Sequence, residues 1–476
     1  LQEEITMSKF SEYLRNLING SGESISAISR SIGAERTSIH KALSDERVLP
    51  YKVVQNLARH FNLSLDERQE FLRLYYILLQ GEEAYRNRQA VCELLNHLSS
   101  IEFHKVASPV ASKLPPANSL IRGEYAVHSV IRSLLISESE QEKAEFHFLL
   151  PSKLNLTTEL MELWLSGREF YVDQILCFYT QKDASVENIR LLGSVIPLCM
   201  ASVGKYQPYY FHNTSDAVTL SPMSYYIITP NYLLQFSEDL SCAQLQGMPE
   251  LIEHYNNYYQ RLIQCCDPLT QCNTSILDIL QEYITTTAPD EIQVMMAQPC
   301  TARYYTPEII HKYMRSSNVP YQDMLALVER YFSVLRQNSM RYYSIFTEKG
   351  LLDLFNSNVI VDLPPQFVPP LEHEDILAML RQLRSDIAKD NICGLITRPT
   401  QLKLPDYLSI SVSAQNKINI YPTNAFLFGT YCCNIHISDE SLCRIFQDFV
   451  QSLPGSPMVY SKEDCLKLLD QLTLPF

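Results

Sequence analysis

The spacing of apolar residues changes partway along the chain, and this change limits the folds that the chain can adopt. Up to residue 80, apolar residues such as Phe10, Leu14 and Ile18 recur every three or four positions, which is typical of amphipathic helices. Beyond residue 120, short apolar runs rich in strand formers, such as Glu145–Leu150 and Ser224–Thr229, alternate with helical stretches. We therefore expect a multidomain protein with an all-α head followed by an α/β (α+β) body.

The length of 476 residues favours several domains over one core. Three prolines, Pro109, Pro115 and Pro116, mark the end of a connecting segment between the head and the body. The predicted division is a head at 1–80, a helical linker at 81–120, a first α/β lobe at 121–290 and a second lobe at 291–476.

Local signals place the helix ends in the head. Ser24 and Ser64 each precede an apolar-periodic stretch and are suitable N-caps. Gly33 breaks the chain between two short helices, and Pro50 suits the start of a further helix.

The charge of the chain is unevenly distributed. The formal net charge is −14, yet residues 1–80 contain as many basic as acidic residues, so the acidic excess lies beyond the head. This asymmetry fits a nucleic-acid-binding head on an acidic body. No apolar run reaches the length of a membrane-spanning helix, and the first residues are acidic, unlike a signal peptide. We expect a cytoplasmic protein that has no membrane partner.

The chemistry-bearing residues do not form a recognisable catalytic or metal motif. The 13 cysteines include no CxxC pair, and we expect reduced thiols. Two groups contain metal-ligand residue types but lack the spacing of zinc ligands: Cys265, Cys266 and Cys272, and Cys432, Cys433, His436 and Cys443. The sequence contains no GxSxG, phosphate-binding glycine loop or HExxH. We therefore predict no enzymatic activity, no metal and no cofactor, with a structural role for His147, His212 and His254.

The body contains three pairs of similar segments in the same order, which predicts an internally duplicated, two-lobed unit. The pairs are 130–134 with 379–383, 151–156 with 399–404, and 236–239 with 437–440. In this alignment Ser237 and Ser438 are equivalent helix caps, and the first copy holds extra residues around 157–200.

The strongest local motif is Ile28-Ser-Arg-Ser-Ile-Gly33-Ala-Glu-Arg-Thr-Ser-Ile39. With Ile28 and Ser29 before the turn, Gly33 in it and Ile39 after it, the segment resembles the helix-turn-helix of lambda-repressor-like (XRE family) regulators. Ser29 is small, as a tight helix crossing requires, and Gly33 permits the turn. Pro50 and the helix after it extend the resemblance, which covers about residues 7–65.

The resemblance implies a set of DNA-binding residues. In that family the helix after the turn enters the major groove, with its N-terminal residues at the base edges. Carried over by position, these are Arg36, Thr37 and Lys41, with Ser38 and His40 beside them, and Arg47 in the next loop as a phosphate contact. Two positions depart from the family pattern: Ile25 replaces a common polar phosphate contact, and Glu35 replaces a Ser or Thr cap.

These observations favour a sequence-specific DNA-binding transcriptional regulator. Its partners would be double-stranded DNA and a second copy of the chain, because one small head contacts too little DNA for tight binding. The body would dimerise, or bind an unidentified small-molecule or peptide effector, or both. It also resembles phospholipase D-like sensor domains, although the HxKxxxxD signature of active members is absent. Two alternatives stay open: a non-enzymatic scaffold of the antitoxin or phage-defence type, and a hydrolase that the head localises on DNA.

Overall fold

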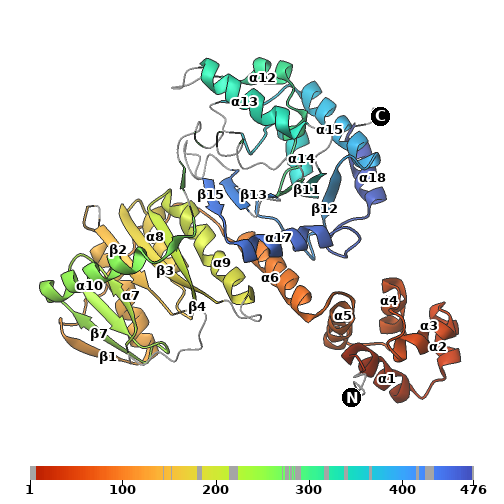
Figure 1. The fold of residues 1–476 in the computed structure, drawn as a ribbon, viewed down its shortest axis with the longest axis horizontal. Helices are drawn as coiled ribbons and strands as arrows, with labels where there is room; N and C mark the ends of the chain where they lie inside the picture. The colour runs from red at the N-terminus through yellow and green to blue at the C-terminus, as the bar shows by residue number, and fades with distance from the viewer. Residues whose placement is uncertain are drawn as a thin grey trace. The chain divides into compact units, whose positions relative to one another are not determined.

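The chain forms two compact units, Leu1–Gln89 and Ala90–Phe476 (Figure 1). The structure, a computed structural model, describes residues 7–142, 144–151, 153–179, 185–213, 223–270, 272–273, 278, 281, 284, 291–315, 321–336, 341–363, 367–413, 417–423 and 434–473. The first unit contains the head and the second contains the body. In the described residues no helix combines the length and apolar character that a membrane crossing requires.

The head is all helix, as the apolar spacing predicted. Its helices are α1 (Lys9–Ser21), α2 (Ile25–Ile32), α3 (Arg36–Leu43), α4 (Tyr51–His60) and α5 (Leu65–Gln80), and α6 (Glu82–Leu98) follows and continues into the second unit. One core unites the helices, with Phe10, Ile28, Ile39, Leu57 and Phe71 almost fully buried.

The predicted caps are confirmed in this unit. The Ser24 side chain accepts a hydrogen bond from the Ala27 amide at the start of α2. The Ser64 side chain accepts from the Glu67 amide, and the Glu67 carboxylate in turn accepts from the Ser64 amide, so α5 begins with a capping box. Pro50 stands at the N-cap of α4. Each helix start is thus determined by residues within one turn of it.

The body contains two mixed sheets. The first has the order β1 (Ser119–Arg122), β7 (Cys242–Gln246), β6 (Leu233–Phe236), β5 (Tyr225–Ile228), β2 (Ala144–Leu149), β3 (Phe170–Tyr179), β4 (Tyr206–Asn213), β8 (Asp267–Pro268). The second has the order β12 (Cys393–Thr397), β11 (Arg341–Thr347), β10 (Glu291–Met296), β13 (Leu408–Ser413), β14 (Lys417–Pro422), β15 (Asn434–Ile437), β9 (Cys272–Asn273). The fold class of helical head plus α+β body is therefore confirmed.

The two sheets share one strand plan, which supports the predicted duplication. In the first sheet β2, β3 and β4 are parallel, β2 pairs antiparallel with β5, and β6, β7 and β1 follow in antiparallel order. In the second sheet β10, β11 and β12 are parallel, and β13, β14, β15 and β9 follow in the same way. Sheet one with its helices is called lobe 1, and sheet two with its helices lobe 2.

The residue alignment on which the duplication was predicted is wrong. By strand order β2 corresponds to β10, whereas the proline alignment paired the end of β2 at Pro151 with the end of β12 at Pro399. Residues 130–134 lie in α7 (Glu124–Glu138) before β2, but 379–383 lie in α15 (His373–Ala388) before β12. Amphipathic helices and strand ends resemble one another locally, so short matches cannot establish the register of a repeat.

The predicted serine caps are also wrong. Ser237 lies in the turn between β6 and β7, where its side chain accepts a hydrogen bond from the Cys242 amide at 3.2 Å. The cap of α17 (Glu440–Ser452) is Asp439, whose carboxylate accepts from the Leu442 amide at 2.8 Å. The two serines therefore stand on unrelated elements.

The longer connections lie in lobe 2, which reverses the prediction of extra residues in the first copy. Residues 150–169 join β2 to β3 and include α8 (Thr157–Leu165), and 180–205 join β3 to β4 and include α9 (Ser185–Ser202). The equivalent connections in lobe 2 are 297–340 and 348–392, each about twice as long. They contain η1 (Ala302–Tyr304), α12 (Pro307–Tyr313), α13 (Tyr321–Leu335), α14 (Glu348–Ser357) and α15.

Helices cover both faces of the first sheet, and alternate residues of its strands pack against one face or the other. Phe146 and Phe148 of β2 face the core shared with α7, α8 and α9, whereas His147 points to the opposite face, which α10 (Pro249–Ile263) covers through Ile252 and Tyr259. In lobe 2, α17 follows β15 as α10 follows the equivalent strand β7 in lobe 1, and α18 (Lys462–Thr473) packs on α15 and β12. One core cluster extends through both lobes and includes α9 and α17.

The C-terminal half of α6 packs within this body core. The Asn96 side-chain oxygen accepts from the Lys403 amide at 2.7 Å, and the Leu98 carbonyl accepts from the Tyr407 hydroxyl at 3.0 Å. On the other side, a Cβ at Gly193 of α9 would lie 3.3 Å from the ring of His97. This half of α6 therefore contacts both lobes.

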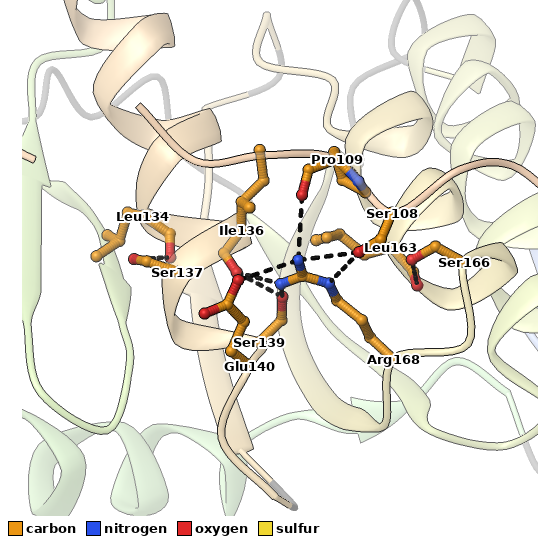
Figure 2. Close-up of polar contacts among 10 residues, drawn as sticks. All are labelled: Ser108, Pro109, Leu134, Ile136, Ser137, Ser139, Glu140, Leu163, Ser166 and Arg168. Atoms are coloured by element: carbon orange, nitrogen blue, oxygen red, sulfur yellow. Dashed lines mark hydrogen bonds and ion pairs between the residues drawn. The ribbon is translucent and has the colours of Figure 1, made fainter. Parts of the chain in front are cut away.

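Arg168 anchors the linker that follows α6 (Figure 2). Its guanidinium donates to the Ser108 hydroxyl and the Pro109 carbonyl of the linker, each at 3.2 Å, and to the Ser139 hydroxyl at 2.8 Å. It also donates to the Ile136 carbonyl in the last turn of α7, where a cation complements the helix dipole. The side chain is 11% exposed. Arg168 thus has a structural role in holding linker and lobe 1 together.

Candidate functional site

The turn between α2 and α3 has the geometry that its sequence predicts. Gly33 adopts φ of 68°, in the left-handed region that glycine enters without strain, and the Ala34 amide donates to the Ser29 carbonyl at 3.0 Å. Ser29 is buried, and its hydroxyl donates to the Ser26 carbonyl. A Cβ at Gly33 would meet nothing within 4 Å. The glycine is therefore required for its backbone conformation and not for space.

Helix α3 divides into a buried and an exposed face. Ile39 and Ala42 are packed in the head core. The predicted site residues Arg36, Thr37, His40 and Lys41 are exposed, and Ser38 is half-buried. The Arg36 Nε and the His40 Nε2 are 3.4 Å apart, one turn along the same face. The structure thus places these predicted residues together on one exposed side of a short helix.

Arg47 is exposed on the loop after α3, and a network of hydrogen bonds to the half-buried Asp45 holds that loop in place. Asp45 accepts hydrogen bonds from the Ser8 amide and hydroxyl, both at 2.6 Å, and from the Ser11 hydroxyl at 2.5 Å. Partial burial acts to raise the pKa of Asp45, but the hydrogen bonds from Ser11 and Ser8 outweigh it and lower that pKa below its usual value. The network fixes the backbone from which Arg47 projects, and the sequence did not indicate it.

The exposed cations extend beyond the residues chosen from the sequence. Arg30 on α2 and Lys52 in the first turn of α4 are also exposed, and Lys52 follows Arg47 closely in the chain. Its position beside a helix start was a signal that could have identified it. Glu35 occupies the N-cap of α3 and makes no side-chain capping bond, so it leaves an exposed carboxylate near Arg36. The surface is therefore cationic but includes opposing charges, because Glu46 beside Arg47 is exposed as well.

Lobe 1 contains a pair of titratable groups on neighbouring strands, with His147 buried and Asp173 half-buried. His147 Nδ1 of β2 lies 3.7 Å from Asp173 Oδ2 of β3, and the His147 ring stacks on Tyr259 of α10 at 4.8 Å. Burial lowers the pKa of His147 to about 4. Burial, with a smaller contribution from Glu145, raises the pKa of Asp173 to about 6. The imidazole is therefore neutral at neutral pH and covered by an aromatic ring.

We expect Asp173→Asn to stabilise the body at neutral pH. The folded-state pKa of Asp173, about 6, is above the usual 3.8. The protonated carboxyl therefore contributes stability that is fully present below pH 3.8 and is lost as the pH rises through 6. The ionised carboxylate should cost about 1–2 kcal/mol, discounted for its partial exposure. Urea denaturation should therefore give the variant a higher free energy of unfolding at about pH 7.5.

The same measurement at about pH 4 should show much of this gain removed. In the folded protein the Asp173 carboxyl is then largely protonated, so it is neutral like the asparagine that replaces it. Glu253→Gln on the exposed surface of α10 is the matched control and should change stability little at either pH. An equal gain for Asp173→Asn at both pH values would contradict the charge explanation.

The other histidine and cysteine groups predicted from the sequence are described only in part. His212 Nε2 lies 3.3 Å from Asp439 Oδ2 and so joins β4 of lobe 1 to the start of α17 in lobe 2. The described part of the chain holds no group of three or more His, Cys, Asp or Glu arranged to bind a metal. Cys432 and Cys433 lie outside the described residues.

Comparison with known proteins gives only weak similarities. No protein-family model matches the chain, and no curated protein matches it. Among solved structures, the archaeal chromatin protein TrmBL2, described for a novel mode of DNA binding, is similar over 54% of this chain and 99% of its own, at 13% identity and a TM-score of 0.24. A phosphatidylserine synthase from Haemophilus influenzae Rd KW20 is similar over 81% of this chain and 97% of its own, at 9% identity and a TM-score of 0.25. Likenesses this slight carry neither a function nor a family to this chain.

Proposed function

We propose that the chain is a cytoplasmic, sequence-specific DNA-binding regulator of transcription with a lambda-repressor-like head. The observation that carries the proposal is the division of α3. Ile39 and Ala42 hold it in the head core, while Arg36 and Lys41 stand exposed on the other side. An arginine at the start of such a helix can bond guanine through two donors, and Thr37 and Ser38 can contact bases or phosphates.

The remaining cations suit contacts with the DNA backbone. Arg47 lies in the loop that leads into α4, Lys52 lies in the first turn of α4, and both are exposed. The hydrogen bonds of Asp45 fix the backbone just before Arg47. Little backbone entropy would therefore be lost when the Arg47 side chain contacts a phosphate. Such contacts would position the head without reading sequence.

The body supplies the second half of the proposal. A single head of this size contacts too little DNA for tight specific binding, so we propose a homodimer on a near-palindromic site. The body would hold the dimer, sense an effector, or do both. The effector would act by favouring one arrangement of the body over another, since a ligand shifts an equilibrium only through unequal affinity for its states.

We further propose that the chain acts without catalysis. Burial raises the pKa of the Cys199 and Cys300 thiols to about 12 each, which makes both poor nucleophiles. His147 is neutral and covered by Tyr259, so it is poorly placed to move protons for a substrate. The scaffold alternative differs in predicting a head that binds protein in place of DNA.

Selection of bound duplexes from a random pool, followed by fluorescence anisotropy with the full chain, tests the proposal. We expect the selected duplex to bind at least about 1,000-fold more tightly than a scrambled one at physiological salt. Arg59→Ala, which removes an exposed cation at the end of α4, is the matched control and should bind as the unaltered chain does. Failure to enrich any sequence, with no binding to either duplex, would reject DNA binding and favour the scaffold.

A further inference from the structure

Lobe 2 contains a cavity at the place where its two long connections meet. The first connection contributes α12 and α13, including Ile309, Val328 and Phe332, and the second contributes Ile360 and Leu371 from the segment between α14 and α15. The cavity volume is about 90 Å³. These connections are about twice as long as their equivalents in lobe 1, so the cavity belongs to the part in which the two lobes differ.

Only apolar surface lines this cavity among the described residues, although two tyrosines contribute to it. The Tyr313 hydroxyl donates to the Asp375 carboxylate and accepts from the Glu372 amide at 2.9 Å. The Tyr305 hydroxyl is 2.7 Å from the Thr301 hydroxyl. Both polar ends are therefore engaged elsewhere, and the tyrosines present carbon to the cavity.

The cavity is partly open to solvent and partly enclosed by the lobe. An unfilled space lined by carbon is unusual there, because packed protein segments leave few spaces larger than a water molecule. A cavity without polar partners does not hold ordered water, and one of about 150 Å³ lined by aliphatic and aromatic side chains stays dry and takes up benzene. Phe332, Ile360 and Leu371 are each nearly buried, so the walls are part of the lobe core.

We propose that this cavity is a binding site for a small, uncharged, apolar or aromatic molecule with about one ring. The lining offers ring faces and aliphatic carbon, and it offers no donor or acceptor among the described residues for a sugar, nucleotide or amino acid. The volume is of the order of a single ring. The further role of this molecule as the effector rests on the proposed regulatory function, whereas its binding does not.

Benzene is the probe for the site, used with the full chain. We expect saturable binding by isothermal titration calorimetry and a thermal unfolding midpoint that rises with benzene concentration. Val328→Phe places a ring in the cavity and should weaken benzene binding at least about 10-fold while raising the midpoint without benzene. Val130→Phe, a half-buried valine on α7 of lobe 1, is the matched control and should bind benzene as the unaltered chain does.

A smaller change protects the test against misfolding. If Val328→Phe does not unfold cooperatively, Val328→Leu should do so and should still weaken benzene binding by several fold. The absence of saturable benzene binding to the unaltered chain would overturn the proposal, as would equal binding by the variant that fills the cavity. A separate anisotropy titration with selected DNA measures DNA binding, on which the effector role depends. Loss of DNA binding in every chain, with benzene binding intact, would reject the proposed function and leave the site standing.

Discussion

Gly350→Ala should destabilise the body by about 3 kcal/mol or more, the largest single-residue effect that we expect. A Cβ at this position in the first turn of α14 would lie 1.8 Å from the Ala297 carbonyl oxygen, 2.3 Å from its carbon and 2.8 Å from the Gln298 nitrogen. All three are backbone atoms directly after β10, so no side-chain rotation can relieve the overlap.

The surrounding hydrogen bonds make a backbone shift costly. The Ala297 carbonyl accepts from the Thr347 amide at 3.0 Å and from its hydroxyl at 3.1 Å, and the same hydroxyl accepts from the Gly350 amide at 2.9 Å. Moving α14 away would break this cap and detach the end of β11 from that of β10. Thr347 and Gly350 thus act together to bring the helix onto the sheet.

Urea denaturation followed by circular dichroism checks this prediction. Gly20→Ala in α1 is the control, because a Cβ there would meet nothing within 4 Å and the residue is exposed. Replacing this helical glycine should stabilise the head by about 0.5–1 kcal/mol. If Gly350→Ala unfolds at the same urea concentration as the unaltered chain, the close approach of α14 to Ala297 is incorrect.

Arg36→Ala should have the largest effect on DNA binding. Arg36 is exposed at the start of α3, and the loss of a bidentate contact to guanine should cost about 1–3 kcal/mol on the selected duplex. Because the lost contact reads a base, preference should relax at one base pair in each half-site. Binding to a scrambled duplex should change much less. Anisotropy titrations of both duplexes measure the difference.

Arg47→Ala should behave differently, because Arg47 is proposed to contact a phosphate. Its loss should weaken binding to selected and scrambled duplexes about equally and reduce the magnitude of the salt slope by about one for each lost contact. A salt series on both duplexes, with Arg59→Ala as the unaffected control, separates the two arginines. Equal losses on both duplexes for Arg36→Ala would remove it from base reading. Unchanged binding by both variants would remove Arg36 and Arg47 from the proposed DNA contact.

The head could be predicted closely because its signals are local. Ser24 and Ser64 cap helices within one turn, and Gly33 is required by the sign of one backbone angle. These cap hydrogen bonds join residues that are close neighbours in the sequence, so the bonding partners can be predicted from the sequence. The exposed face of α3 follows for the same reason, since burial of Ile39 determines which way Arg36 and Lys41 point.

The duplication was predicted from segment pairs that do not correspond, and it is the shared strand plan that supports it. Local similarity paired α7 with α15 and the end of β2 with the end of β12, whereas strand order pairs β2 with β10. Strand neighbours are chosen by contacts between residues far apart in the chain. A proline at a strand end or an acidic helix start is common to many elements, so it carries no information about which strand lies beside it.

By itself, then, the sequence determined the helical head, its caps, its turn and the change to an α+β body, because these depend on spacing and on residues within a few positions of each other. Tertiary structure alone decided the order of the strands, the long-range contacts of Asp45 and Arg168, the close approach at Gly350 and the cavity in lobe 2. Each of these depends on the meeting of segments tens of residues or more apart, and that meeting is governed by the packing of the whole unit.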